Sequence, residues 1–474
     1  MWTPKRTSSE SHKLWQVVIQ RRVNDRVDAL RPHRWNWQAL ARPIDRSLQR
    51  DVSQPLAQDT VRNLRFFWLD GLFSAVSENF YLGYVTLFAL AFGATNGQVG
   101  MVTAAGNLFG AISLFPGARL VERWGRRKPL ILWSAGGLGR FVLLSLALVP
   151  FLTTQAELAI ALIILLNGLR AFMGSLANPA WTALVADLVP DFLRGNYFSR
   201  RNFAMGLAAL VVAPLAGQII NVGNEIAGFE FLGYQAVFLF AFLFGVISTL
   251  SFRRIDEPAP SDAALRPHQR GDLRRALRQN PAFVGLVISA FIWNMALQVA
   301  APFFNVYLVA ELGATTTMVG AVASVSSLTA LFGQRYFGRW LDRKGTIWVI
   351  MVSGALIPGL PLAWIFITEP WHVGIINTFG GFLWAGYNLA NFNLLLTLTP
   401  DEQRPRAVAL FQTAVFSSSV VGPVLGGYLA DVFSFQLIFL LSAAGRLLGT
   451  LALFWFTVRV LRNRAAKKVE DSAS

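Results

Sequence analysis

The sequence predicts an all-α membrane protein in which twelve transmembrane helices form two pseudo-symmetric bundles of six. Three observations lead to this prediction. The 474 residues are 54% hydrophobic and only 14% charged, which is too little charge to cover the surface of a soluble protein of this size. Long apolar runs alternate with short connections, and one pattern of residues occurs twice, about half a chain apart.

Twelve apolar runs are long enough to cross about 30 Å of hydrocarbon at roughly 1.5 Å per residue. In chain order they lie near residues 65–93, 98–118, 129–152, 157–186, 200–221, 230–252, 283–310, 315–337, 346–368, 371–398, 406–430 and 434–460. The predicted organisation is a basic cytoplasmic N-terminal tail (1–63), a first six-helix bundle (64–252), a cytoplasmic linker (253–281), a second six-helix bundle (282–461) and a cytoplasmic C-terminal tail (462–474).

The net charge of +16 is concentrated in alternate connections between the apolar runs. Basic connections lie within residues 123–128, 194–201, 253–278, 335–344 and 404–406, whereas the connections between them contain no Lys or Arg. Because basic residues collect on the cytoplasmic side of a membrane, we predict a multi-pass protein of the plasma membrane with both termini in the cytoplasm. This bias explains the charge without nucleic acid as a partner.

The repeated pattern relates the two halves of the chain. Such a spaced repeat of a whole set of helices indicates duplication and is typical of secondary transporters. The elements Gly93-Ala94-Thr95, Val99-Gly100 and Arg123-x-Gly125 recur as Gly313-Ala314-Thr315, Val319-Gly320 and Arg343-x-Gly345, and Asn178 has a counterpart in Asn388.

Two basic turns carry a more specific signal, because a glycine, an acidic residue, an arginine and a second glycine occur in each. The sequence reads Gly117-Ala-Arg-Leu-Val-Glu122-Arg123-Trp-Gly125-Arg126 after the second run and Gly338-Arg-Trp-Leu-Asp342-Arg343-Lys-Gly345 after the eighth. This pattern resembles the signature turn of the major facilitator superfamily (MFS), although Ala118 and Glu122 depart from it. Glycines permit a tight turn, and a carboxylate near a helix end can pair with basic groups.

The resemblance implies the MFS fold and a secondary active transporter that moves a small solute by alternating access, with proton coupling expected. It also implies that the two turns gate the cytoplasmic side. The predicted gating residues are Glu122, Arg123, Gly125, Arg126, Gly338, Asp342, Arg343 and Gly345.

Four predicted spans carry polar residues at three- and four-residue spacing, which places each set on one helix face. They are the first, fourth, seventh and tenth spans, and in the family that the chain resembles the helices at these positions line the central cavity. Polar side chains are costly in lipid, although packing alone would explain any single asparagine. The predicted substrate cavity contains Ser74, Glu78, Tyr81, Asn167, Arg170, Asn178, Asn294, Gln298, Trp384, Asn388 and Asn391.

Glu78 is the one carboxylate of this set near the middle of the membrane, and Arg170 and Arg140 lie at comparable depth. We predict that Glu78 and Arg170 couple proton movement to substrate movement. The alternative is a static buried ion pair between the first and fourth spans. Arg446, in the last span, has no polar stripe around it and is predicted to snorkel or to pack.

The eleventh span contains Gly422-Pro423-x-x-Gly426-Gly427. This motif is similar to the glycine-proline motif of antiporters, which belongs in the fifth span, where this chain has Ala213-Pro214-x-x-Gly217. Pro and paired Gly also bend and closely pack membrane helices whatever the direction of transport. The packing interpretation is favoured over a diagnosis of efflux.

The sequence gives little support to an enzyme. The four histidines are scattered, and the chain has no HExxH motif, no cysteine and no phosphate-binding loop that ends in Lys-Ser or Lys-Thr. We predict no cofactor and no metal site. The predicted partners are a small-molecule substrate, the lipid bilayer and a proton or other coupling ion, with a monomeric chain. A facilitative uniporter, a channel and a non-transporting receptor on the same scaffold are the alternatives, and the substrate and direction stay open.

Overall fold

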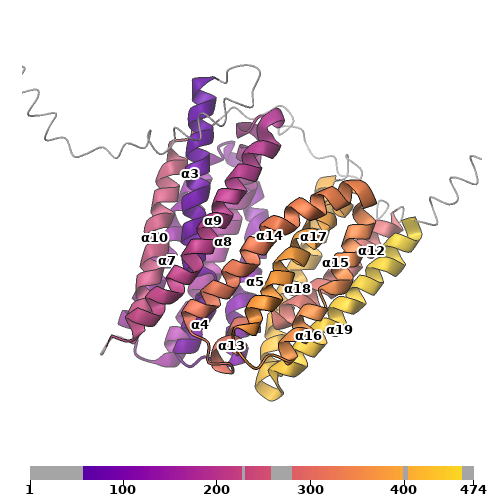
Figure 1. The fold of residues 1–474 in the computed structure, drawn as a ribbon. Helices are drawn as coiled ribbons and strands as arrows, with labels where there is room; N and C mark the ends of the chain where they lie inside the picture. Colours follow the sequence, from indigo (N-terminus) through magenta and orange to yellow (C-terminus); the bar gives the residue numbers. More distant parts are fainter. Residues whose placement is uncertain (1–56, 227–229, 258–279, 399–403, 462–474) are drawn as a thin grey trace, which may run out of the picture. The chain divides into compact units, whose positions relative to one another are not determined.

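The computed structural model describes residues 57–226, 230–257, 280–398 and 404–461. The chain divides into two compact units, residues 1–65 and 66–474. The predicted tails lie wholly or almost wholly outside the described residues, as does most of the predicted linker, so the predicted domain limits stay a prediction. Within the described segments the secondary structure is helical and no strand occurs (Figure 1).

The first half of the fold consists of the helices up to residue 253, three of whose six spans are single helices of 29 residues or more. Their bounds are α3 Gln58–Tyr81, α4 Val85–Ala91, α5 Asn96–Trp124, α6 Lys128–Trp133, the π-helical turn η1 Ser134–Leu138, α7 Gly139–Leu152, α8 Ala156–Leu188, α9 Asp191–Asn224 and α10 Leu232–Arg253.

The second half repeats this order after the linker. Its bounds are α12 Pro281–Ala300, α13 Phe303–Ala310, α14 Thr316–Lys344, α15 Thr346–Leu356, α16 Gly359–Ile365, α17 His372–Leu398, α18 Arg404–Val432, α19 Phe435–Leu453 and the π-helical turn η3 Phe454–Val458.

Ten helical segments of the described chain are long and apolar enough to cross a membrane. Two predicted spans are not among them. They are the first, which consists of α3 and α4, and the tenth, which is α17. Both carry polar stripes, with Asp70 and Glu78 on α3 and four asparagines on α17, and these residues lower the mean hydropathy. The helices therefore agree with the predicted all-α fold of twelve spans.

Several predicted spans are broken rather than continuous. Pro302 lies at the start of α13 and Pro358 at the start of α16, and a proline removes a backbone donor from the helical ladder. The third span contains the π-helical turn η1, which includes Gly136 and Gly137; π-helical segments occur mostly as such single turns within α-helices. These breaks lie within the predicted spans and do not change their number.

Matched hydrogen bonds support the internal repeat. The Asn167 side chain on α8 donates to the carbonyl of Val102 on α5 at 2.6 Å, and Asn377 on α17 donates to the carbonyl of Val322 on α14 at 2.8 Å. The helix pairs α5–α8 and α14–α17 pack in the same way in the two halves. Asn167 and Asn377 are therefore equivalent positions.

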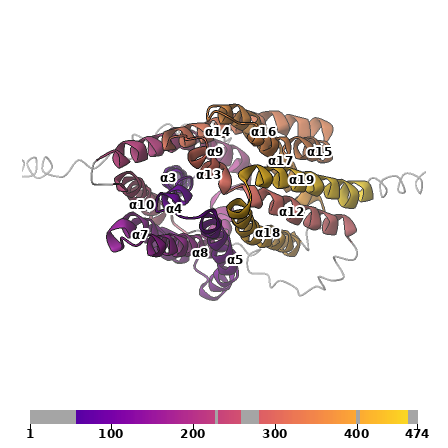
Figure 2. The same ribbon diagram turned by 90° about the horizontal axis from the view of Figure 1, so that it is seen from below.

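The two halves meet through α5 with α18 and α9 with α14 (Figure 2). Close backbone approach defines this contact, because a Cβ added at Gly100 would strike the carbonyl of Pro423 and one added at Gly217 would strike that of Thr316. The contacts gather at one end of the bundles, and α9 and α14 diverge toward the other end (Figure 1). The glycines of the eleventh span also pack against backbone, in agreement with the packing interpretation of that motif.

Candidate functional site

A charged cluster lies inside the first half and brings three helices together. The Glu78 carboxylate on α3 is paired with Arg170 on α8, and its Oε1 lies 3.7 Å from Nη1 of Arg140 on α7. The side chains of Glu78, Arg170 and Arg140 are 31%, 16% and 11% exposed, respectively. The carboxylate is therefore held by two mostly buried arginines but remains partly accessible.

The residues around the cluster fix its geometry. Arg140 donates to Ser77 at 3.2 Å and to Ser74 at 3.3 Å, and the Arg170 guanidinium lies 4.1 Å from the centre of the Tyr81 ring, an attractive cation–π geometry. The Tyr81 hydroxyl donates to Asn167. Five predicted cavity residues, Ser74, Glu78, Tyr81, Asn167 and Arg170, are thus brought into one connected network.

Arg140 completes this network, although the sequence indicated only that it lies at a depth comparable to that of Glu78. It comes from a peripheral helix without a polar stripe, so the spacing on its own helix carried no signal. The buried Nε atoms of Arg140 and Arg170 have no hydrogen-bond partner. The cluster holds two guanidinium groups for one carboxylate, so a change in the charge of Glu78 changes the electrostatics of α3, α7 and α8 together.

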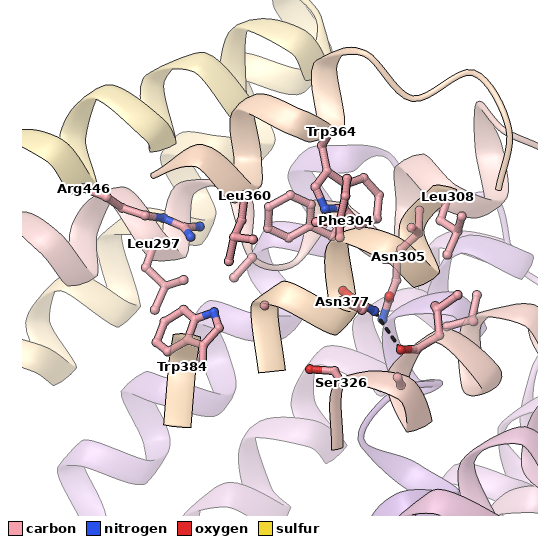
Figure 3. Close-up of a pocket in the computed structure, with 17 residues that line it drawn as sticks. Leu297, Phe304, Asn305, Leu308, Ser326, Leu360, Trp364, Asn377, Trp384 and Arg446 are labelled. Atoms are coloured by element: carbon pink, nitrogen blue, oxygen red, sulfur yellow. Dashed lines mark hydrogen bonds between the residues drawn. The ribbon is translucent and has the colours of Figure 1, made fainter. Parts of the chain in front are cut away.

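A cavity of about 260 Å³ lies within the second half, between α12, α13, α14, α16, α17 and α19 (Figure 3). Its walls are mainly apolar and aromatic, with Leu297, Phe304, Trp364 and Trp384 among them. A second cavity of about 450 Å³ shares Ser326 and Trp384 with the first and includes Gln334 and Asn388. Apolar walls with a few polar groups are typical of small-molecule sites.

Arg446 on α19 lines the first cavity and is only 2% exposed. Of the two predicted alternatives, snorkelling and packing, this burial fits packing, because a snorkelling side chain would carry its charged group to the membrane surface. Its Nε donates to Ser442 at 3.1 Å, while Nη2 is buried without a partner. The sequence missed this residue as a site candidate since it stands alone on its helix.

Other predicted cavity residues lie apart from the charged cluster. Asn178 is exposed and accepts a hydrogen bond from Thr182 on its own helix, and Asn294 donates to the carbonyl of Ala290 one turn earlier. Gln298 packs against Gly422 on α18, and Asn391 borders a small void beside Trp293. Only Trp384 and Asn388 of the predicted second-half residues line the two larger cavities.

The signature turns are built as the glycine pattern predicts. Gly125 ends α5 with φ of 60°, and Gly345 separates α14 from α15 with φ of 83°, a left-handed conformation that side chains disfavour. Arg123, Arg126, Asp342 and Arg343 are exposed, and a Cβ at Gly338 would meet no neighbouring atom. The side chain of Glu122 lies outside the described residues, and the gating role of both turns stays a prediction.

Beside the first turn, an ion-pair network joins three helices. Arg127 donates to Asp187 at 2.5 Å, at the end of α8, and to Glu257 at 3.3 Å, after α10.

A second, separate network surrounds Asp70 on α3. Asp70 accepts a hydrogen bond from Ser248 on α10 at 2.7 Å, and Arg201 on α9 approaches it to 3.8 Å. Sequence spacing did not reveal these networks because their members lie on different helices.

No group of three or more His, Cys, Asp or Glu residues with the geometry of a metal site occurs in the described part of the chain.

The family follows from the sequence as a whole. The model of the Major Facilitator Superfamily matches residues 67–394 and 295–473. The chain belongs to the Major Facilitator Superfamily. As an MFS member with helices of this length and hydropathy, it is a multi-pass membrane transporter, as the signature turns predicted.

The MFS assignment agrees with individual relatives. The chain is 25% identical over 386 residues to a "Multi-drug resistance efflux pump PmrA homolog" of Lactococcus lactis, with coverage of 79% of this chain and 90% of the relative. It is 25% identical to the "Multidrug resistance protein MdtG" of Dickeya zeae, with coverage of 86% and 97%. Among solved structures, the nucleoside transporter NupG has a TM-score of 0.64 at 13% identity and covers 82% of this chain and 99% of its own.

Proposed function

We propose that this MFS member is a proton-coupled exporter of small amphipathic molecules across the plasma membrane, with both termini in the cytoplasm. The names of relatives that match most of the chain refer to multidrug efflux, which supports export of drug-like molecules. The aromatic and apolar walls of the second-half cavities suit such molecules.

The observation that carries the proposal is the Glu78 carboxylate held between Arg170 and Arg140. Glu78 is 31% exposed, so protons can reach it, whereas its two partners are largely buried. Protonation removes the charge that attracts both guanidinium groups and weakens the contacts of α3 with α8 and α7. A change in helix packing then accompanies each proton that is bound or released.

The distribution of basic connections supports an orientation for the described conformation. The halves contact each other at the end that carries the connections near residues 93–98 and 221–230, and these connections have no Lys or Arg. Under the positive-inside rule this end faces outward. The described conformation is then closed on the outer side, and the diverging end faces the cytoplasm.

The test uses purified protein in proteoliposomes with a substrate found by a thermal-shift screen of drug and metabolite panels. Wild type should accumulate the substrate when a pH gradient is imposed. Glu78→Gln should lose this accumulation but retain exchange of labelled for unlabelled substrate, because a permanently neutral side chain mimics one protonation state and cannot cycle. Arg170→Ala should impair both activities, since it leaves the carboxylate without its closest partner.

Glu157→Gln is the matched control, because Glu157 is an exposed carboxylate at the start of α8 and its neutralisation should change neither activity. Accumulation by Glu78→Gln with an unchanged pH profile would show that Glu78 is a structural partner only.

A facilitative uniporter is the second candidate, because a Glu78–Arg170 pair that stays closed throughout the transport cycle would carry no proton. A uniporter would equilibrate the substrate in wild-type vesicles without any response to the imposed pH gradient. Labelled substrate would still exchange by counterflow, which a channel cannot support.

A further inference from the structure

The second half contains a buried guanidinium group without a counter-ion. Arg446 is 2% exposed, and no ion pair of the described residues includes it. Its hydrogen bond to Ser442 at 3.1 Å uses Nε only, and the buried Nη2 has no partner. A charge in a low-dielectric interior without a partner is costly, so this arrangement calls for a further explanation.

The guanidinium group points into the 260 Å³ cavity, on the side where Leu297 and Trp384 lie (Figure 3). The centre of the Trp293 ring is 6.0 Å from the guanidinium carbon, at the outer limit of a cation–π contact. The other polar groups of the cavity are the uncharged side chains of Asn305, Ser326 and Asn377 together with the Trp indoles. A negative charge within the cavity would therefore have Arg446 as its one charged partner among the lining residues.

The internal repeat shows why the cavity exists at this place. Arg170 follows the equivalent residue Asn167 by three positions, and Gly380 follows Asn377 by three positions. Ser77 on α3 donates to the carbonyl of Ala241 on α10, and Ser442 on α19 donates to that of Ala296 on α12 at the matching crossing. Glu78 follows Ser77 and Leu297 follows Ala296, so these two positions are equivalent. The first half holds a glutamate and an arginine where the second half has Leu297 and Gly380, and both of these line the cavity.

A second set of matched contacts places Arg446 beside this space. Thr249 on α10 donates to the carbonyls of Gly136 and Gly245, each at 3.0 Å. Thr450 on α19 donates in the same way to those of Gly354 and Arg446, at 3.0 and 2.9 Å. Arg446 is thus the equivalent of Gly245, against which Arg140 packs in the first half.

Each half therefore has one arginine at the same helix crossing. In the first half it comes from α7 (Arg140), whereas in the second half it comes from α19 (Arg446). In the first half Arg140 has Glu78 beside it, 3.7 Å away. In the second half the carboxylate is missing, and a cavity takes the place of the ion pair. An external anion would complete the second-half arrangement.

We propose that this cavity is a subsite for an aromatic anion, whose carboxylate or similar group binds Arg446 and whose ring packs among Phe304, Trp364 and Trp384. The inference deepens the proposed function and rests on it, since it names the class of molecule that the transporter recognises. A volume of 260 Å³ holds a bicyclic aromatic acid, and the adjoining 450 Å³ cavity gives room for a longer substituent.

The experiment measures equilibrium binding to purified full-length protein by calorimetry, with 2-naphthoate as the anionic probe and 2-naphthamide as its neutral isostere. Wild type should bind 2-naphthoate at least about tenfold more tightly than 2-naphthamide, because hydrogen bonds to a charged partner are the strong ones. Arg446→Gln should remove this preference, and Arg446→Lys should retain most of it because the positive charge is kept.

Leu297→Glu is the sharper variant, since it copies the first half and supplies an internal carboxylate to Arg446. It should reduce 2-naphthoate binding by at least about tenfold, and monodisperse elution together with a thermal melt will show that the variant is folded. Leu297→Gln, which is isosteric but uncharged, is the matched control and should retain the preference for the anion. Equal binding of both probes by wild type, or an unchanged preference in both Arg446→Gln and Leu297→Glu, would overturn the subsite.

Failure of this inference can be told from failure of the proposed function. Binding is measured without a gradient, so it does not depend on coupling through Glu78. Loss of the anion preference in wild type with Glu78-dependent accumulation intact would refute the subsite alone. An Arg446-dependent preference with normal accumulation in Glu78→Gln would support the subsite and refute the coupling role of Glu78.

Discussion

At the scale of single residues, buried charges have different surroundings in different parts of this transporter. Glu78 shares two arginines, Arg127 has two carboxylates, and Arg446 has none among the described residues. A charge with several hydrogen-bonded partners stabilises the fold only while all of them are present. The Arg127 network is expected to be structural, because two carboxylates balance its one guanidinium group. The arginines beside Glu78, like Arg446, keep buried nitrogen atoms without a partner, and such incomplete sets mark places where a proton or ligand can act.

The Arg127 network is a structural set of this kind, and a stability measurement tests it. Arg127→Ala should lower the free energy of unfolding by about 3 kcal/mol, because it leaves Asp187 and Glu257 without their buried partner. The neighbouring Arg126 is exposed, so Arg126→Ala serves as the control and should have little effect. The melting temperature of each purified variant is the measurement, and equal values would mean that the network contributes nothing to stability.

At the scale of elements, the start of α5 is stabilised from both halves of the fold. Thr95 accepts from the backbone N–H of Gln98 and the Gln98 side chain accepts from that of Thr95, which forms a capping box. Asp431 of α18 also accepts from the backbone N–H groups of Asn96 and Gly97, at 3.1 and 2.8 Å. A carboxylate at a helix N-terminus is favourable, and here it joins helices of opposite halves.

Asp431→Asn should weaken the closed end at which the two halves meet, because it removes a negative charge from the start of α5. The expected cost is about 0.3–1 kcal/mol. Thr317 contacts Gln218 across the two halves, so Thr317→Cys reports on opening at this end. Its labelling rate with an impermeant maleimide should rise roughly two- to fivefold.

Glu311→Gln, in a connection at the same end, is the control and should not change the rate. A labelling rate that Asp431→Asn leaves unaltered would mean that this contact does not hold the two halves together at this end.

At the scale of the whole molecule, the alternation of basic and non-basic connections predicts the orientation in the membrane. The chain has no cysteine, so single introduced cysteines report on their own positions. Thr154→Cys, at an exposed position between α7 and α8, should react with an impermeant thiol reagent in intact cells. Ser261→Cys, in the predicted linker and outside the described residues, should react only after the membrane is permeabilised, and the reverse pattern would invert the predicted topology.

The sequence by itself determined the all-α class, the twelve spans, the internal repeat and the family resemblance. Each depends on local properties that the chain records directly, namely hydropathy over about 20 residues, helical spacing and the glycines of the two turns. The same spacing placed Ser74, Glu78 and Tyr81 on one helix face, which the structure brings together with Asn167 and Arg170.

Only the tertiary structure decided which of these charges have partners and where the cavities lie. Arg140, Asp431 and Arg446 stand on helices without a polar stripe, so their surroundings depend on neighbours that are distant in the sequence. Asn294 and Gln298 share a predicted face, yet one binds its own helix and the other packs against α18. The physical reason is that spacing along a helix sets the direction of a side chain, whereas packing between helices sets what it meets.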